Sequence, residues 1–525
     1  MQIEVQNMNY TMATCAGDHM LYYLSFISFI TLLLVHFFIK SWLKPRPAIQ
    51  TPPSPPALPI IGHLHLIGSV LPKSFQTLAR QYGPLMQIRM GASTCVVVSD
   101  AVLAKEIFKT HDVTFSSRPE FGSSEYFIYR GSRFVMAQYG DYWRFMKKLC
   151  MTRLLAVPQM DSTIDIREEE IEKLVERVTE STRDGNPCDL SRQLTILTNN
   201  IACRMAMSAR CSGSCNEAEE IHELVKLCLQ LAGKLSVGDV LGPLKMLDFS
   251  GNGKKLVTAL QRFDVLVERI IKEHELKVID GGDGASDQKK DLLDILLETY
   301  RDATAEVKIT RKDIKSFLLD LFVAGTDTSS TAMQWAMGEL MNNPKAFKKL
   351  REEINSVVGP NKLVKESDMP NLPYLGAVIK ETLRLHPSAP LIIRECAEDC
   401  QVNGSIVKAK TRVLVNVYAI MRDPVSWKDP DEFIPERFLE SSGERIGEHQ
   451  MEYKGQNFRY LPFGSGRRGC PGASLAMLMM HPAIAALVQR FDWKLKDGRE
   501  KVDLTQGSGF AAEMATPLVC YPITV

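Results

Sequence analysis

The sequence predicts a mainly α-helical protein with small β-sheets, and three observations support this fold class. Helical periodicity dominates the chain, for example in Glu168–Thr182, Gly253–Lys277 and Pro344–Val358. Strand signals are few and short. The 525 residues are 45% hydrophobic and 24% charged, an ordinary globular composition that excludes a disordered or fibrous protein. No second linker and no internal repeat follows Gly62, so we expect residues 62–525 to form one large unit.

Charge and cysteine usage exclude several functional classes. Lys and Arg number 63 and Asp and Glu 62, so the net charge of +1 gives no overall field that would attract nucleic acid. The 12 cysteines form no CxxC pair, and no HExxH is present, so neither a disulfide scaffold nor a common zinc pattern is supported. We therefore interpret the cysteines as mostly reduced thiols, with room for one functional exception.

The N-terminus predicts a membrane anchor at residues 20–40, after a short lumenal segment at residues 1–19. Met20–Ile39 carries no charge and, as a helix, is about 30 Å long, which is the hydrocarbon thickness of a bilayer. Basic residues follow the run and acidic residues precede it, which places the rest of the chain in the cytosol. We expect a single-pass protein of the endoplasmic reticulum membrane. A cleaved signal peptide is the alternative, but the run is long for one and lacks a small-residue cleavage site.

Residues 41–61 are dense in proline and predict a stiff, extended hinge between the anchor and the cytosolic unit. A loose linker or a ligand for an SH3 domain is the alternative interpretation of this segment.

The few strand signals predict two hairpins. Met86–Met90 and Thr94–Val98 flank a Gly-Ala-Ser turn, and Asn403-Gly404 before Thr411–Val415 suggests a second hairpin. The Gly- and Asp-rich stretch Asp280–Lys290 lies between two helical patterns and is expected to be a disordered loop.

The most informative helix is expected over Arg311–Asn342, a rod of about 48 Å. Thr310 and Asp313 have the spacing of a capping box, and Asn343-Pro344 ends the pattern. Its middle, Ala324–Thr331, is rich in Gly, Ser, Thr and Asp, which are poor helix formers. Such a conflict indicates either a functional interruption or a polar kink at a helix crossing.

The glycine-dense loop Phe463–Gly472 presents Cys470 immediately before an apolar helix. Free backbone N–H groups, the helix dipole and two arginines all favour a thiolate at this position. Such a thiolate could be a nucleophile, a zinc ligand or the axial ligand of a haem iron. No companion cysteines support zinc, and no local protease pattern is present, although a triad formed in space stays open. Gly464 to Gly469 also matches GxGxxG, but the strand and βαβ unit that a dinucleotide site needs are missing.

This loop, FGSGRRGCPG, resembles the FxxGxRxCxG haem-ligand loop of the cytochrome P450 monooxygenases, and four further motifs occur in the order typical of that family. They are the WRFMK stretch from Trp143, the AGTDTS segment from Ala324, the ExxR pair from Glu381 and the PERF segment from Pro435. The resemblance covers the whole chain and implies the cytochrome P450 fold behind an N-terminal transmembrane helix. Finer details are similar to the plant A-type branch, near flavone synthases, pterocarpan hydroxylases and triterpenoid oxidases.

The resemblance implies a role for each matched residue. Cys470 is the expected axial thiolate of haem b, and therefore the metal ligand. Asp327 and Thr328 are the expected catalytic pair that delivers protons to the oxygen site. Glu381 and Arg384, three residues apart on one helix face, are expected to meet Arg437 in a structural ionic triad. The other expected cofactor-binding residues are Arg468, Trp143, Lys147, Arg394, Phe463, Gly466 and Gly472.

The implied partners are O2, an NADPH-dependent cytochrome P450 reductase, the lipid bilayer and an apolar small molecule, with no nucleic acid. Lys148, Arg459 and Arg467 could form a basic docking patch for the reductase or an ordinary solvated surface. By family position, the substrate-facing stretches are Phe121–Val135, Phe317–Ala324, Ser388–Ile393 and Gly507–Ala512. The residues that we expect to face the substrate, within or beside these stretches, are Gly325, Ala389, Leu391, Ile392 and Phe510.

The apolar character of these stretches favours a rigid hydrocarbon substrate. We favour a pentacyclic triterpenoid, with one methyl group oxidised in steps to a carboxylic acid, and a flavonoid or isoflavonoid is the alternative. A haem-binding protein without turnover would keep Cys470 but has no need of Asp327 and Thr328. A nicotinamide dehydrogenase would need the context that the GxGxxG match lacks.

Overall fold

The computed structural model describes residues 22–33, 35–36, 51–208, 217–237, 251–280, 289–439, 455–495, 498–507 and 512–525. Residues 22–33 and 35–36 are helical and exposed. Within the described ranges, no helix combines the length and the apolar character that crossing a membrane requires. The other residues of the predicted anchor at residues 20–40, like most of the loop Asp280–Lys290, lie outside the described residues.

Helices make up most of the described chain, which confirms the predicted fold class. They are α2 (Leu71–Tyr82), α3 (Ala101–Lys105), α4 (Asp141–Leu149), α5 (Val157–Ser162), α6 (Ile164–Arg183), α7 (Leu190–Met207), α8 (Glu217–Val237), α9 (Asn252–Asp280), α10 (Leu292–Arg301), α11 (Arg311–Gly325), α12 (Asp327–Asn342), α13 (Pro344–Val357), α14 (Pro373–Leu385), α15 (Val417–Ile420) and α16 (Ala473–Arg490).

The largest described sheet has the strand order β1-β2-β7-β4. Its strands are β1 (Leu85–Met90), β2 (Ser93–Val98), β4 (Leu391–Glu395) and β7 (Arg412–Asn416). β1 and β2 form the first predicted hairpin, since they pair antiparallel from Leu85 opposite Val98 to Met90 opposite Ser93. β7 runs parallel to β2 and antiparallel to β4.

Asn403-Gly404 forms a hairpin turn as predicted, with both residues at positive φ. The turn joins β5 (Cys400–Val402) to β6 (Ser405–Val407). The stretch Thr411–Val415, which the sequence placed after this turn, enters the four-stranded sheet as β7. A third sheet has the order β3-β9-β8, with β3 at Cys188–Asp189, β8 at Phe491–Leu495 and β9 at Val519–Thr524.

The expected rod over Arg311–Asn342 consists of two helices that meet at Thr326. Thr310 caps α11 as predicted, because its hydroxyl accepts from the Asp313 N–H at 3.2 Å and the Asp313 carboxylate accepts from the Thr310 N–H at 2.8 Å. α12 ends at Asn342, before Pro344. The interruption therefore falls inside the segment that local propensity identified.

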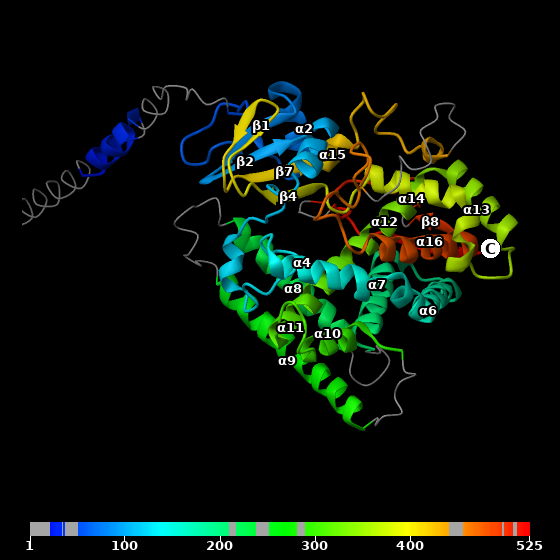
Figure 1. Ribbon diagram of the computed structural model, residues 1–525. Coiled ribbons are helices and arrows are strands. Elements are labelled where there is room, and N and C mark those ends of the chain that lie inside the picture. Colours follow the sequence, from blue (N-terminus) through cyan, green and yellow to red (C-terminus); the bar gives the residue numbers. More distant parts are fainter. Residues whose placement is uncertain are drawn as a thin grey trace, which may run out of the picture.

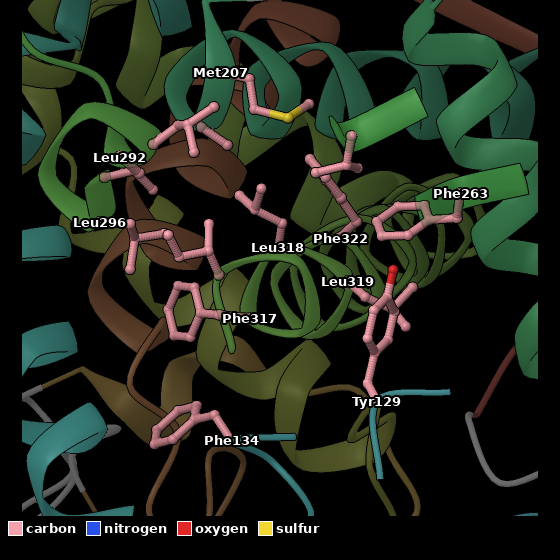
Figure 2. Packing of buried hydrophobic residues seen from close by; sticks show 14 of the residues in the cluster. Tyr129, Phe134, Met207, Phe263, Leu292, Leu296, Phe317, Leu318, Leu319 and Phe322 are labelled. Atoms are coloured by element: carbon pink, nitrogen blue, oxygen red, sulfur yellow. The ribbon is translucent and has the colours of Figure 1, made fainter. Parts of the chain in front are cut away.

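Apolar side chains form one large cluster between α8, α9, α10 and α11 and a second around α6, α7, α12, α14 and α16. Figure 1 shows the four-stranded sheet with α2 and α15 at one end of the molecule and α8 to α11 at the other. In Figure 2, Phe317, Leu318, Leu319 and Phe322 of α11 lie at the centre of the first cluster. α11 is therefore held on several sides, which fixes the position of the helix break.

The described end of the proline-rich hinge, residues 51–61, is packed on the sheet. The carbonyl of Pro53 accepts from the Gln87 N–H of β1 at 2.7 Å. The imidazole of His63, which is buried, bridges the carbonyl of Pro55 at 2.8 Å and the N–H of Arg89 at 2.7 Å. These contacts fix the point at which the hinge enters the body.

Candidate active site

The loop that carries Cys470 is a compact turn closed by its own backbone. The N–H of Cys470 donates to the carbonyl of Phe463 at 2.9 Å, and the N–H of Gly469 donates to that of Gly466 at 2.9 Å. Gly466 has a φ of +70°, and a Cβ there would lie 2.5 Å from Asp112 Oδ1 and 2.7 Å from the carbonyl oxygen of Phe108. The loop therefore needs glycine at this position both for its backbone conformation and for close packing.

The side chain of Cys470 is exposed, whereas the other described cysteines are buried or half-buried. Surrounding protein raises the pKa of its thiol by desolvation, and the backbone N–H of Gly472 and the charge of Lys147 oppose that shift. Lys147 also donates to the carbonyl of Gly469 at 2.9 Å, which ties α4 to the cysteine loop. The thiol is thus accessible to a ligand and has hydrogen-bond and cationic support for a thiolate.

Three arginines gather beside this loop, of which Arg394 and Arg468 are buried and Arg118 is half-buried. Arg394 extends from β4, Arg468 from the cysteine loop, and Arg118 from the segment after the carboxyl end of α3. Arg394 donates to the carbonyl of Arg468 at 3.5 Å, and Arg118 donates to the carbonyl of Ile393. Within the described ranges, none of the three forms an ion pair with a carboxylate, and the Nε of Arg118 is buried without a partner.

The electrostatics of these three guanidinium groups favour an anionic ligand. Burial lowers the pKa of Arg118 to about 10, and burial together with Arg118 lowers that of Arg468 to about 9. Burial and the charges of Arg118 and Arg468 hold the pKa of Arg394 well below its ordinary value. A ligand with two carboxylates would balance two of the three positive charges and could use the free donor of Arg118. A haem, with its two propionates, fits this donor set.

Arg118 was missed in the sequence. It lies about 350 positions before Cys470, so no local spacing connects the two, and only the fold brings Arg118 to Ile393 and Arg394. His222 and Lys226 of α8 were also missed. Their charges act to lower the pKa of Asp327. They lie in an ordinary amphipathic helix, so nothing in the local sequence marks them as site residues.

Trp143 and Arg468, both predicted to bind the cofactor, are in direct contact. The guanidinium carbon of Arg468 lies 4.4 Å from the centroid of the Trp143 ring. The Nε of Arg468 donates to the carbonyl of Ser116 at 2.7 Å. Four of the predicted cofactor-binding residues, Trp143, Lys147, Arg394 and Arg468, are thus brought together around the loop of Cys470.

The helix break places polar groups next to small, accessible residues. Ala324 is exposed and Gly325 and Thr328 are half-buried, although α11 and α12 run through the centre of the molecule. The Thr328 hydroxyl donates to the carbonyl of Ala324 at 2.6 Å, and Ser388 donates to the carbonyl of Thr328 at 2.9 Å. The side of the helix that carries Thr328 therefore faces open space.

Asp327 is positioned to hold a proton. Burial raises the pKa of its carboxyl above the ordinary value, and the positive charges of His222 and Lys226 oppose the shift. A carboxyl with a raised pKa retains its proton to higher pH, so Asp327 can act as a proton donor at the helix break.

The predicted ionic triad is present and buried. Arg384 donates to Glu381 through Nε at 2.7 Å and through a terminal nitrogen at 2.9 Å. Arg437 donates to the same carboxylate at 2.9 Å, as does the backbone N–H of Ile434. Glu381 and Arg384 are both fully buried. The triad joins α14 to the segment around Arg437 and has no contact with Cys470.

The predicted substrate-facing residues occupy different environments. Ala389 is exposed, and Ile392 is half-buried, with its Cδ1 next to Gly464 of the cysteine loop. Leu391 packs against the apolar cluster of α2 and β1. Phe510 lies outside the described residues.

Comparison with known proteins agrees with this geometry. The sequence profile of the family "Cytochrome P450" matches residues 52–521. A "3,9-dihydroxypterocarpan 6A-monooxygenase" of Glycine max is 44% identical over 90% of this chain and 92% of its own. A "Beta-amyrin 24-hydroxylase" of the same organism is 41% identical over 95% and 97%.

A solved structure, that of a zebra fish cytochrome P450 with progesterone, has the same fold. It covers 86% of this chain and 99% of its own, with a TM-score of 0.71 and 24% sequence identity. Members of the matched family bind haem b through a cysteine thiolate and use O2, a redox partner and a small-molecule substrate. The chain therefore belongs to the cytochrome P450 monooxygenase family, on the plant A-type branch near the pterocarpan and β-amyrin hydroxylases.

Proposed function

We propose that this P450 is anchored in the endoplasmic reticulum membrane and oxidises an unactivated C–H bond of a pentacyclic triterpenoid. The observation that carries the site assignment is the juxtaposition of accessible Cys470 with Arg118, Arg394 and Arg468, none of which is paired with a carboxylate in the described part of the chain. Cys470 would hold the haem iron through its thiolate, and the arginines would bind the haem propionates. The bound haem supplies the centre at which O2 is activated and one oxygen atom is inserted into the substrate.

The chain's own residues prepare this site for catalysis. Lys147 and the Gly472 N–H stabilise the thiolate of Cys470. Asp327 holds a proton and passes it to the hydroxyl of Thr328, which faces the open side of the helix break. Electrons come from an NADPH-dependent reductase, and the hinge at residues 41–61 holds the body at a fixed pose on the bilayer.

A basic docking patch receives only partial support. Arg467 is paired with Asp112 at 3.2 Å, and Lys148 lies 3.4 Å from Glu306. Arg459 is exposed. The reductase therefore has to compete with acidic neighbours for two of these three cations.

Two relatives support two substrate classes. The β-amyrin hydroxylase supports the triterpenoid, and the half-buried apolar side chain of Ile392 beside the cysteine loop suits a rigid hydrocarbon skeleton. The pterocarpan monooxygenase, 44% identical, supports an isoflavonoid as the second candidate. For the triterpenoid we propose that one methyl group passes in successive oxidations through the alcohol and the aldehyde to the acid.

The first test is the carbon monoxide difference spectrum of the reduced protein in microsomes. A red-shifted Soret band, absent from Cys470→Ala, is expected from thiolate-ligated haem. A band retained in that variant would refute the ligand assignment. The same microsomes, supplied with reductase and NADPH, are then given β-amyrin or an isoflavonoid. Alcohol, aldehyde and acid products from β-amyrin support the first proposal, and a hydroxylated isoflavonoid alone supports the second.

A further inference from the structure

A buried carboxylate on α11 fixes the segment of chain that precedes α4. Asp320 is 2% exposed. Its Oδ1 accepts from Arg133 at 3.0 and 2.7 Å, and its Oδ2 accepts from the backbone N–H of Val135 at 2.9 Å. The guanidinium of Arg133 also lies 4.5 Å from the Phe127 ring centroid. Both oxygens of Asp320 are thus used to hold residues 133–135.

The held segment continues directly to Arg468. The carbonyl of Val135 accepts from one terminal nitrogen of Arg468 at 3.5 Å, and the carbonyl of Ala137 accepts from the other. Between Arg133 and these carbonyls, Phe134 stacks on Trp143, with ring centroids 6.3 Å apart and planes 10° apart. Trp143 in turn lies against Arg468. The segment therefore forms one continuous packed connection from α11 to this arginine.

The manner in which Arg468 is held makes its orientation dependent on that segment. Its partners within the described ranges are backbone carbonyls, which orient a guanidinium through hydrogen bonds without neutralising it. Two of the three carbonyls belong to residues 133–137. If the segment shifts, the direction in which Arg468 presents its charge shifts as well.

We propose that Asp320 is a positioning residue for Arg468. By clamping Arg133 and Val135, it sets the carbonyls that aim the guanidinium of Arg468 at the haem propionates. The inference rests on the proposed function, because it assumes that Arg468 binds the cofactor.

A purely stabilising role for Asp320 predicts a different outcome, and the chain offers a matched control. Asp264 of α9 also accepts from this region and from α11, through Tyr129 at 3.1 Å and Lys315 at 2.8 Å. Among the described residues, its hydrogen bonds go to Tyr129 and Lys315 and not to residues 133–137. Asp320→Asn and Asp264→Asn each remove one carboxylate charge that pairs with a cation, from a buried side chain at Asp320 and a half-buried one at Asp264, but only the first acts on the carbonyls that hold Arg468.

The experiment is a double-mutant cycle on haem retention, with purified holoenzyme and excess apomyoglobin as the haem acceptor. Asp320→Asn and Arg468→Lys are each expected to speed haem transfer by about five- to tenfold, and the double variant should be no faster than Arg468→Lys alone. Asp264→Asn should match the wild-type rate. If Asp320→Asn does not fold, Arg133→Gln replaces it in the cycle, since that variant leaves the bond from Asp320 to the Val135 N–H.

Two results would overturn the inference. If the accelerations of haem transfer by Asp320→Asn and Arg468→Lys multiply in the double variant, Asp320 does not act through Arg468. If Asp264→Asn speeds haem transfer as much as Asp320→Asn does, the effect reflects a general loss of stability. A wild-type protein without a thiolate haem spectrum would refute the proposed function as well, whereas failure to oxidise either substrate class would leave the haem-transfer result standing.

Discussion

Neutralising Glu381 tests the interpretation of the ionic triad as the structural centre of the body. Glu381→Gln keeps the size of the side chain but leaves Arg384 fully buried and Arg437 nearly so, without a counter-charge. Removing one partner of a buried ion pair costs about 3–5 kcal/mol. The carbonyl groups of Met421 and Pro430, at 2.9 and 2.7 Å from Arg384, provide hydrogen bonds but no charge.

This free-energy cost corresponds to a measurable shift in the melting temperature. Unfolding entropy is about 2.1 cal/mol/K per residue, so the 525-residue chain changes its Tm by about 1 °C for each kcal/mol. We expect Glu381→Gln to lower the apparent Tm by about 3–5 °C. The assay is thermal denaturation of the haem-bound proteins followed by circular dichroism at one scan rate, because unfolding of large proteins is often irreversible.

Glu352→Gln is the matched control for this substitution. Glu352 pairs with Lys348 at 3.8 Å on α13, and the two side chains are 65% and 79% exposed. An exposed pair of this kind contributes about 0–1 kcal/mol to stability. The Tm of Glu352→Gln should therefore stay within about 1 °C of that of the wild type. Equal shifts in the two variants would refute the reasoning, because burial of Arg384 would then have no energetic consequence.

Three further predictions concern separate parts of the molecule. Thr328→Ala should retain the haem spectrum but divert NADPH electrons to hydrogen peroxide, so unchanged coupling of NADPH use to product would contradict the proton-delivery role. Arg118→Leu should speed haem transfer to apomyoglobin without lowering the Tm of the apoprotein, and a lower apoprotein Tm with unchanged haem transfer would contradict its assignment. Burial lowers the pKa of His274, but its hydrogen bond to Asp291 at 2.8 Å outweighs burial and raises the pKa above 6.5. The stabilisation is then complete below pH 6.5 and lost as pH rises through the raised pKa, so the Tm difference from His274→Gln should shrink between pH 5.5 and 8.5, and a difference that grows would contradict it.

The elements that the sequence predicted correctly are those encoded by neighbouring residues. The β1–β2 hairpin follows from alternating side chains around a turn, and the start of α11 follows from the Thr310–Asp313 capping box. The break at Thr326 follows from a cluster of poor helix formers. In each of these cases, the deciding interactions lie within a few residues.

What the sequence missed depends on contacts between distant segments. The stretch before Asn416 pairs with β2 and β4, because strand partners are set by the whole fold and not by the nearest turn. Arg118 belongs to the site only because the fold places it beside Arg394. Asp320 looked like one polar position in an apolar helix, and its partner Arg133 is 187 residues away.

Buried arginines serve two distinct purposes in this fold, and their counter-charges separate the two. Arg384 is neutralised by Glu381 inside the protein, so its interactions are complete without a ligand. Arg394 and Arg468 are also buried and Arg118 is half-buried, but these three repel one another and are held by backbone carbonyls. Such a cluster destabilises the empty protein and is relieved by an anion that binds only the folded state. Haem binding should therefore stabilise the fold in part by relieving the repulsion among these arginines, and the triad should contribute equally with and without the cofactor.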